Sequence, residues 1–117
     1  MQIRSVDTLL KDTLATHCST VARLYTSKKP VTYCTYQMLN AASRDYADDG
    51  AQGDEYYYRI DIYSKKDYLT LVENLIKDLK SKDFYGIEIT SETYESELGY
   101  YHISIELYFF DYESEEE

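Results

Sequence analysis

Apolar side chains recur along this chain with two periods, and each period predicts one kind of element. In residues 3–15 and again in residues 68–79, apolar positions repeat every three or four residues, which predicts two short amphipathic helices. The apolar stripe of the first comprises Ile3, Val6, Leu9, Leu10 and Leu14. The stripe of the second comprises Tyr68, Val72, Leu75, Ile76 and Leu79. We expect Ser5 to cap the first helix, and Ser64 with Asp67 to cap the second.

Five segments rich in β-branched and aromatic residues predict strands. They are residues 21–25, 31–39, 56–63, 87–94 and 100–112. The first two flank a polar segment that ends at Pro30, and we interpret them as a hairpin. The last two are separated by a short segment containing Gly99, which predicts a second hairpin.

Strict alternation assigns the two faces of the later strands. One face of residues 56–63 is expected to be partly exposed to solvent. It carries Tyr57, Arg59, Asp61 and Tyr63. The opposite face should be buried, together with alternate positions of residues 100–112. Three isoleucine pairs are the expected strand contribution to the core: Ile60 and Ile62, Ile87 and Ile89, and Ile103 and Ile105.

Two segments show no apolar period. Residues 40–55 are small, polar and acidic and contain Gly50 and Gly53, which predicts a long loop. The run ESEEE predicts a disordered acidic tail over residues 113–117. The remaining order predicts a single α+β domain over residues 1–112, with a mostly antiparallel four- to five-stranded sheet and two helices packed on one face.

Charge narrows the possible partners. The 117 residues include 22 acidic and 12 basic side chains, and the resulting net charge of -10 repels phosphate backbones and anionic lipid surfaces. We therefore expect no sequence-specific nucleic-acid binding. No apolar run is long enough to cross a bilayer, and the first residues lack a secretion signal, so we expect no membrane partner and a cytosolic site of synthesis. Cys18 and Cys34 are expected to remain thiols and to fill the core.

Candidate metal ligands have unsuitable spacing. The acidic loop offers the hard oxygen ligands that calcium prefers, which are Asp45, Asp48, Asp49, Asp54 and Glu55. With Gly50 at the glycine position of an EF-hand loop, however, Ala47 and Tyr56 would fall at ligand positions. A zinc site is also disfavoured, because His17 and Cys18 are adjacent while Cys34 and His102 belong to separate predicted strands. We expect no metal and no cofactor.

No arrangement of residues predicts an enzyme. Neither histidine belongs to a nucleophile–base motif, and the four glycines form neither a dinucleotide-binding nor a P-loop motif. Carboxylate pairs such as Glu92 and Glu95 are inevitable among so many acids. We therefore expect no catalytic residues.

Tyrosine is the unusual component, with 15 tyrosines and no tryptophan. Exposed tyrosines together with arginine are typical of protein interfaces, although tyrosine also suits a half-buried strand. A tyrosine-rich sheet surface favours self-association. The candidate interface residues, taken from the loop and the following strand, are Tyr46, Asp48, Asp49, Asp54, Tyr57, Arg59 and Tyr63.

Residues 30–112 also carry a succession of motifs that resembles a known family. The motifs are PVTYCTY, YADDG, YYYRIDIYSKKDYLTLVENL, DFYGI and YESELGYYHISIELYFF. Together they resemble the tail-terminator, or tail-completion, proteins of long-tailed bacteriophages. In that family a strand leading into S-x-x-D-Y and a capped helix recur, as does a closing hairpin with an aromatic end.

The resemblance implies a ring, expected to be a hexamer, on the head-proximal end of the completed tail tube. Such a ring ends tail polymerisation and forms the surface to which the head docks. The implied partners are further copies of the chain, the tail tube protein and head connector or closure proteins, and DNA could pass through the lumen. By analogy, residues 40–55 would contact the tube or connector. The implied location is the tail–head junction of the virion, with assembly in the bacterial host cytoplasm.

Three alternatives stay open. A head-completion protein of the same phage neck would have a similar size and also form rings, but its loss would give leaking heads rather than overlong or unjoined tails. A non-viral acidic adaptor would bind a basic partner as a monomer, so a monomeric mass at high concentration would favour it. A small hydrolase is the third alternative.

Overall fold

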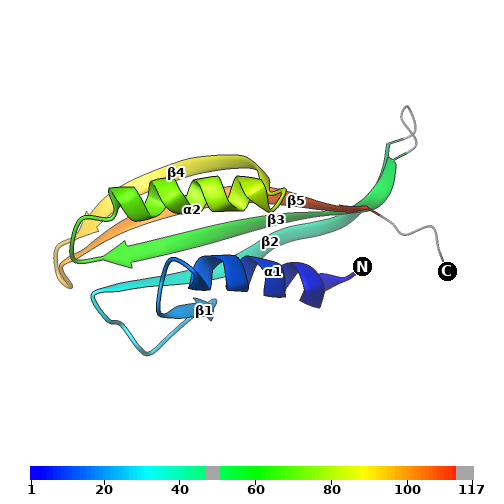
Figure 1. Cartoon of the computed structure of the whole chain (residues 1–117). Helices are drawn as coiled ribbons and strands as arrows, with labels where there is room; N and C mark the ends of the chain where they lie inside the picture. Colours follow the sequence, from blue (N-terminus) through cyan, green and yellow to red (C-terminus); the bar gives the residue numbers. More distant parts are fainter. Residues whose placement is uncertain (47–50, 113–117) are drawn as a thin grey trace.

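Five strands and two helices follow one another along residues 1–46 and 51–112, which are the residues that the computed structural model describes (Figure 1). In chain order they are α1 (Ile3–Ala15), β1 (Val21–Arg23), β2 (Thr32–Tyr46), β3 (Ala51–Ser64), α2 (Leu69–Ser81), β4 (Tyr85–Glu95) and β5 (Tyr100–Tyr112). The strands form one sheet in the order β1-β2-β3-β5-β4. Only β1 and β2 are parallel, so the predicted α+β class and mostly antiparallel sheet are confirmed.

Both helices lie against one face of the sheet (Figure 1). The central strands supply Tyr56, Tyr58, Ile60 and Ile62 from β3 and Ile103, Ile105 and Leu107 from β5, all 3% exposed or less. The helices cover them with Val6, Leu10 and Leu14 from α1 and Val72, Leu75 and Leu79 from α2. Burying each large aliphatic side chain stabilises the fold by about 1.5–3 kcal/mol before chain entropy is subtracted. Most positions of the predicted helical stripes and strand faces thus form the core, whereas Ile3, at the start of α1, is 42% exposed.

The loop predicted over residues 40–55 is wrong over most of its length. β2 continues to Tyr46 and β3 begins at Ala51, and the two strands stay paired antiparallel out to Tyr46 opposite Ala51. This ribbon extends beyond the helices (Figure 1), so no buried face imposes an apolar period on it. Polar pairs across the strands take that place, with the Ser43 hydroxyl donating to Asp54 at 3.0 Å and Arg44 Nε donating to Glu55 at 3.2 Å.

Gly53 lies within β3 in this ribbon and not in a turn. A glycine is needed there because the neighbouring strand β5 passes close to its Cα. A Cβ at residue 53 would lie 2.3 Å from the carbonyl oxygen of Asp111, so only glycine lets β5 approach β3 there. The glycine was a reason to expect a loop, and in the structure it marks a close contact between strands.

The first predicted hairpin is also wrong. β1 pairs with β2 in parallel, with Val21 opposite Cys34 and Arg23 opposite Tyr36. The chain turns away after β1 at Leu24, whose φ of 69° lies in the left-handed region, and residues 25–31 return it to the start of β2. The second predicted hairpin is confirmed, since β4 and β5 pair antiparallel.

Two further details differ from the sequence predictions. Ser5 lies inside α1 and Ser64 inside β3, so neither caps a helix, whereas Asp67 does accept a hydrogen bond of 3.0 Å from the backbone N–H of Leu69. Ile87 is only partly buried and Ile89 is 50% exposed, because β4 is an edge strand. The tail predicted over residues 113–117 lies outside the described residues.

Candidate interaction surfaces

The sheet face opposite the two helices, hereafter the outer face, is covered by no other described element (Figure 1). It displays alternate residues of the central strands. From β3 these are Tyr57, Arg59, Asp61 and Tyr63, and from β5 they are His102, Ser104, Glu106 and Tyr108. The predicted division of β3 into a core face and a partly wet face is therefore confirmed.

Stacked aromatic rings lie at both ends of the outer face. At one end Tyr63 stacks between Tyr33 and His102, with ring centroids 4.7 and 4.2 Å away, and Tyr100 meets Tyr33 edge-on at 5.4 Å. Burial among these neighbours raises the pKa of Tyr33 to about 12. Rings fixed in this way can enter a protein interface without losing much further rotational freedom.

At the other end Tyr108 lies between Tyr57, at a centroid distance of 4.6 Å, and Tyr85, at 5.7 Å. The Tyr108 ring rests on Gly86, whose φ is 59° and whose Cβ would lie 2.9 Å from the ring. Glycine at this position thus leaves room for the Tyr108 ring to pack against β4.

A polar row separates the two aromatic ends. His102 Nε2 lies 2.8 Å from Asp61 Oδ1 and its Nδ1 lies 3.2 Å from Glu95. The buried Ser104 hydroxyl donates directly to the same Asp61 oxygen at 2.7 Å. Ser104 Oγ also lies 3.4 Å from His102 Nε2, so the imidazole lies between the serine and Glu95, as the imidazole of a catalytic triad lies between its serine and its acid. The serine is buried, however, and its hydroxyl donates to Asp61, which ties β3 to β5.

Next to this row, Tyr57 and Arg59 converge on Glu106. The Tyr57 hydroxyl donates a hydrogen bond to Glu106, and Arg59 Nε lies 3.8 Å from the other carboxylate oxygen. This Nε is buried and makes no hydrogen bond to the described residues, so its contact with Glu106 is ionic. The hydrogen bond to Glu106 raises the pKa of Tyr57 to about 12.

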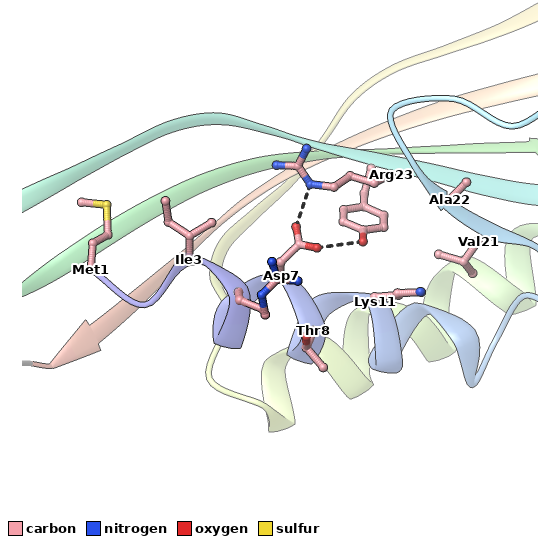
Figure 2. A pocket seen from close by; sticks show the side chains of 10 residues that line it. Met1, Ile3, Asp7, Thr8, Lys11, Val21, Ala22 and Arg23 are labelled. Atoms are coloured by element: carbon pink, nitrogen blue, oxygen red, sulfur yellow. Dashed lines mark hydrogen bonds and ion pairs between the residues drawn. The ribbon is translucent and has the colours of Figure 1, made fainter.

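A second surface feature is a hollow of about 900 Å³ between α1 and β1, hereafter the α1–β1 cleft (Figure 2). Asp7 stands in it and accepts hydrogen bonds from Arg23 Nε at 3.1 Å, from the Tyr36 hydroxyl at 3.0 Å and from the Tyr58 hydroxyl at 3.3 Å. Desolvation, followed by the hydrogen bond to Asp7, raises the pKa of Tyr36 to about 12. Arg4 and Lys11 also line the cleft.

The candidate interface residues do not form one group. Tyr57, Arg59 and Tyr63 lie together on the outer face. Asp54 lies two residues before the buried Tyr56 in β3 and therefore on the helix side of the sheet, and its carboxylate is 3.7 Å from the amino group of Met1. Tyr46 ends β2, and Asp48 and Asp49 lie outside the described residues.

The sequence reasoning missed Asp7, Arg4, Lys11 and the partners of His102. Contacts between distant elements create these groups, and no local motif marks them. The alternation in β5 did place His102 and Ser104 on one face, which was the available signal for the polar row.

Metal ligands do not gather in the part of the chain that the structure describes: no three His, Cys, Asp or Glu side chains lie together in a metal-binding arrangement. Cys18 and Cys34 are both buried in the core, as predicted. A hydrogen bond with Cys18, reinforced by burial, raises the pKa of the Cys34 thiol. Neither described helix has the length and apolar character needed to cross a bilayer.

Comparison with known proteins gives little direct guidance. No protein-family model and no curated protein matches the chain. Among solved structures, a chain in the virion of a native gene transfer agent particle is similar, with a TM-score of 0.46 and 11% identity over 86% of this chain and 84% of that one. A likeness of this degree does not bear on function.

Proposed function

We propose that this chain is a structural protein of a phage virion, which caps the tail tube as a ring, ends tail polymerisation and forms the surface to which the head docks. The observation that carries the proposal is the open outer face. A sheet covered by helices on one side leaves its other side to a partner, and this side presents stacked tyrosines beside charged groups.

The sequence resemblance to tail-terminator proteins supplies the setting. It spans residues 30–112, which contain four of the five strands of the sheet, β2 to β5. The β2–β3 ribbon, which reaches past the helices in a molecule measuring 50 by 24 by 22 Å, is suited to contact a neighbouring tube or connector protein.

We also infer a non-catalytic role. The grouping most like an active site, Asp61 with His102 and Ser104, has the serine hydroxyl bound to the acid and buried. The net charge of -10 suits a ring through which DNA passes, because an anionic lumen repels phosphates.

Electron microscopy of particles assembled without this protein tests the proposal. We expect overlong tails, or finished tails that are not joined to heads, and complementation by the wild-type chain should restore joining. Normal tails beside heads that have lost their DNA would instead indicate the head-completion role. Normal infectious particles would contradict both roles.

A further inference from the structure

Two thiols lie next to each other in the core. Cys18 follows α1 and Cys34 lies in β2, and the two residues are 4% and 0% exposed. They share a hydrogen bond and are both free thiols in the structure. The sequence contains no other cysteine, so each is the only possible disulfide partner of the other within one copy.

Backbone hydrogen bonds bring the two residues together. The N–H of Cys18 donates to the carbonyl of Leu14 at 2.9 Å, which fixes Cys18 at the end of α1. Two residues later, the Thr20 carbonyl accepts a hydrogen bond of 3.0 Å from the N–H of Cys34. Val21 then lies opposite Cys34 in the parallel pair of β1 and β2. The pairing that makes β1 parallel to β2 therefore also places the two cysteines side by side.

The two thiols differ in reactivity. Their hydrogen bond lowers the pKa of Cys18 against the effect of burial, whereas the same bond, reinforced by burial, raises the pKa of Cys34. The thiolate is the form that attacks a disulfide, so Cys18 reacts first. Cys18 is also the more exposed of the two residues. The pair thus provides an attacking thiol with a second thiol beside it.

Local opening of β1 gives an oxidant access to this pair. β1 has three residues, pairs with β2 on one side only and lines the α1–β1 cleft. A short edge strand opens at a lower free-energy cost than the central strands of a sheet. When β1 and the segment before it move away from β2, both Cys18 and Cys34 are uncovered while the rest of the sheet stays paired.

We propose that Cys18 and Cys34 form a reversible disulfide when a small disulfide oxidant reaches them. The Cys18 thiolate attacks one sulfur of the oxidant, whose S–S bond breaks, and the other half of the oxidant leaves as a thiol. The Cys34 sulfur then attacks the Cys18 sulfur and releases the second half as a thiol. The two cysteines lose two electrons and two protons, and the oxidant gains them. This inference goes beyond the proposed function and does not depend on it.

The disulfide would hold β1 against the sheet. It closes a loop over residues 19–33, which contain β1 and the segment leading to β2. Cross-linking a loop of about 15 residues lowers the equilibrium constant of unfolding by roughly 100-fold, because it restricts the unfolded chain. Under the proposed virion role, the pair would stay reduced in the host cytoplasm and oxidise only after the particle is released.

Oxidised glutathione, added to the reduced full-length chain, tests the proposal. We expect the intact mass to fall by the mass of two hydrogen atoms, and dithiothreitol should reverse the change. Trypsin cleaves after Arg23 and Lys28, between the two cysteines, so a peptide map should show the Cys18 and Cys34 peptides joined. The urea midpoint should rise on oxidation. Dilute urea, below the unfolding transition, should accelerate the reaction because it promotes local opening.

Cys18→Ala and Cys34→Ala are the matched controls. Neither variant can form the disulfide, so oxidised glutathione should leave the urea midpoint of each unchanged. Each protein is compared with its own reduced form, so the comparison holds even where an alanine variant is less stable than the wild type.

Three results would overturn the proposal. They are thiols that stay reduced even in dilute urea, a mixed disulfide with glutathione that persists on Cys18, and a disulfide that joins two copies. An internal disulfide without a rise in the urea midpoint would overturn its stabilising effect on the β1 region. The capping function is tested separately by microscopy of assembled particles, and none of these results bears on it.

Discussion

The hydroxyl of Tyr36 in β2 donates a hydrogen bond of 3.0 Å to Asp7 in α1 and so joins the first helix to the sheet. The same carboxylate accepts from Tyr58 in β3 and from Arg23 in β1. One side chain thus ties three strands to the helix that forms a wall of the α1–β1 cleft.

Replacing Asp7 should therefore destabilise the fold. Asp7→Ala leaves two largely buried hydroxyls without their acceptor, and we expect a loss of about 1–3 kcal/mol in the free energy of unfolding. Asp12→Ala, at an exposed position of the same helix, is the control and should change stability by less than about 0.5 kcal/mol. Urea unfolding measures both. Equal effects of the two variants would show that Asp7 does not organise this region.

Ile105 and Ile89 face each other across β5 and β4 but differ in exposure, at 0% and 50%. Ile105→Asp places a charge in the core and should unfold the domain, because the expected total stability is only about 5–15 kcal/mol. Ile89→Asp should remain folded. Thermal melting followed by circular dichroism compares them, and a cooperative melt of Ile105→Asp at the wild-type temperature would refute the position of the core.

Tyr57 and Tyr58 are neighbours in β3 on opposite faces of the sheet. Tyr58 is fully buried, so Tyr58→Ala should cost about 3–5 kcal/mol, as for other large aromatic truncations. Tyr57→Ala loses the stack with Tyr108 and should cost about 0.5–1.5 kcal/mol from that pair, while weakening attachment to tail tubes. Urea unfolding and tube co-sedimentation give the two readouts. Full tube attachment by Tyr57→Ala would exclude this part of the outer face from docking.

Alkaline pH should destabilise the protein through its tyrosines. The pKa values of Tyr33 and Tyr36 are raised from 10.0 to about 12, mainly by burial. A raised pKa in the folded state means that the unfolded chain ionises first, so this contribution is complete below pH 10 and is lost as the pH rises from 10 toward 12. Urea midpoints measured across that interval should fall. A midpoint independent of pH there would contradict the environments assigned to these two rings.

Periodicity predicted the elements that have one buried face. Alternation in β3 and β5 identified the buried isoleucines, and helical spacing gave α1 its bounds, because the core imposes a single side on each. The β2–β3 ribbon escaped prediction since Ser43, Arg44, Asp54 and Glu55 stabilise it by pairing with one another outside the core. Isoleucines on β4 were misassigned because their alternation does not reveal that the strand is an edge.

The candidate surfaces were only partly predictable for a related reason. Tyr57, Arg59 and Tyr63 share a strand, so their common face could be read from spacing alone. The cleft of Arg4, Lys11 and Asp7 depends on β1 pairing in parallel with β2, and the sequence favoured a hairpin there. A wrong strand direction at one edge concealed the basic surface.

Negative-stain microscopy of the purified chain mixed with isolated tail tubes tests the central claim most directly. We expect a closed ring at one end of each tube and no further growth when tube protein is added. Tubes that keep bare ends and continue to elongate, with the chain remaining monomeric in solution, would contradict it.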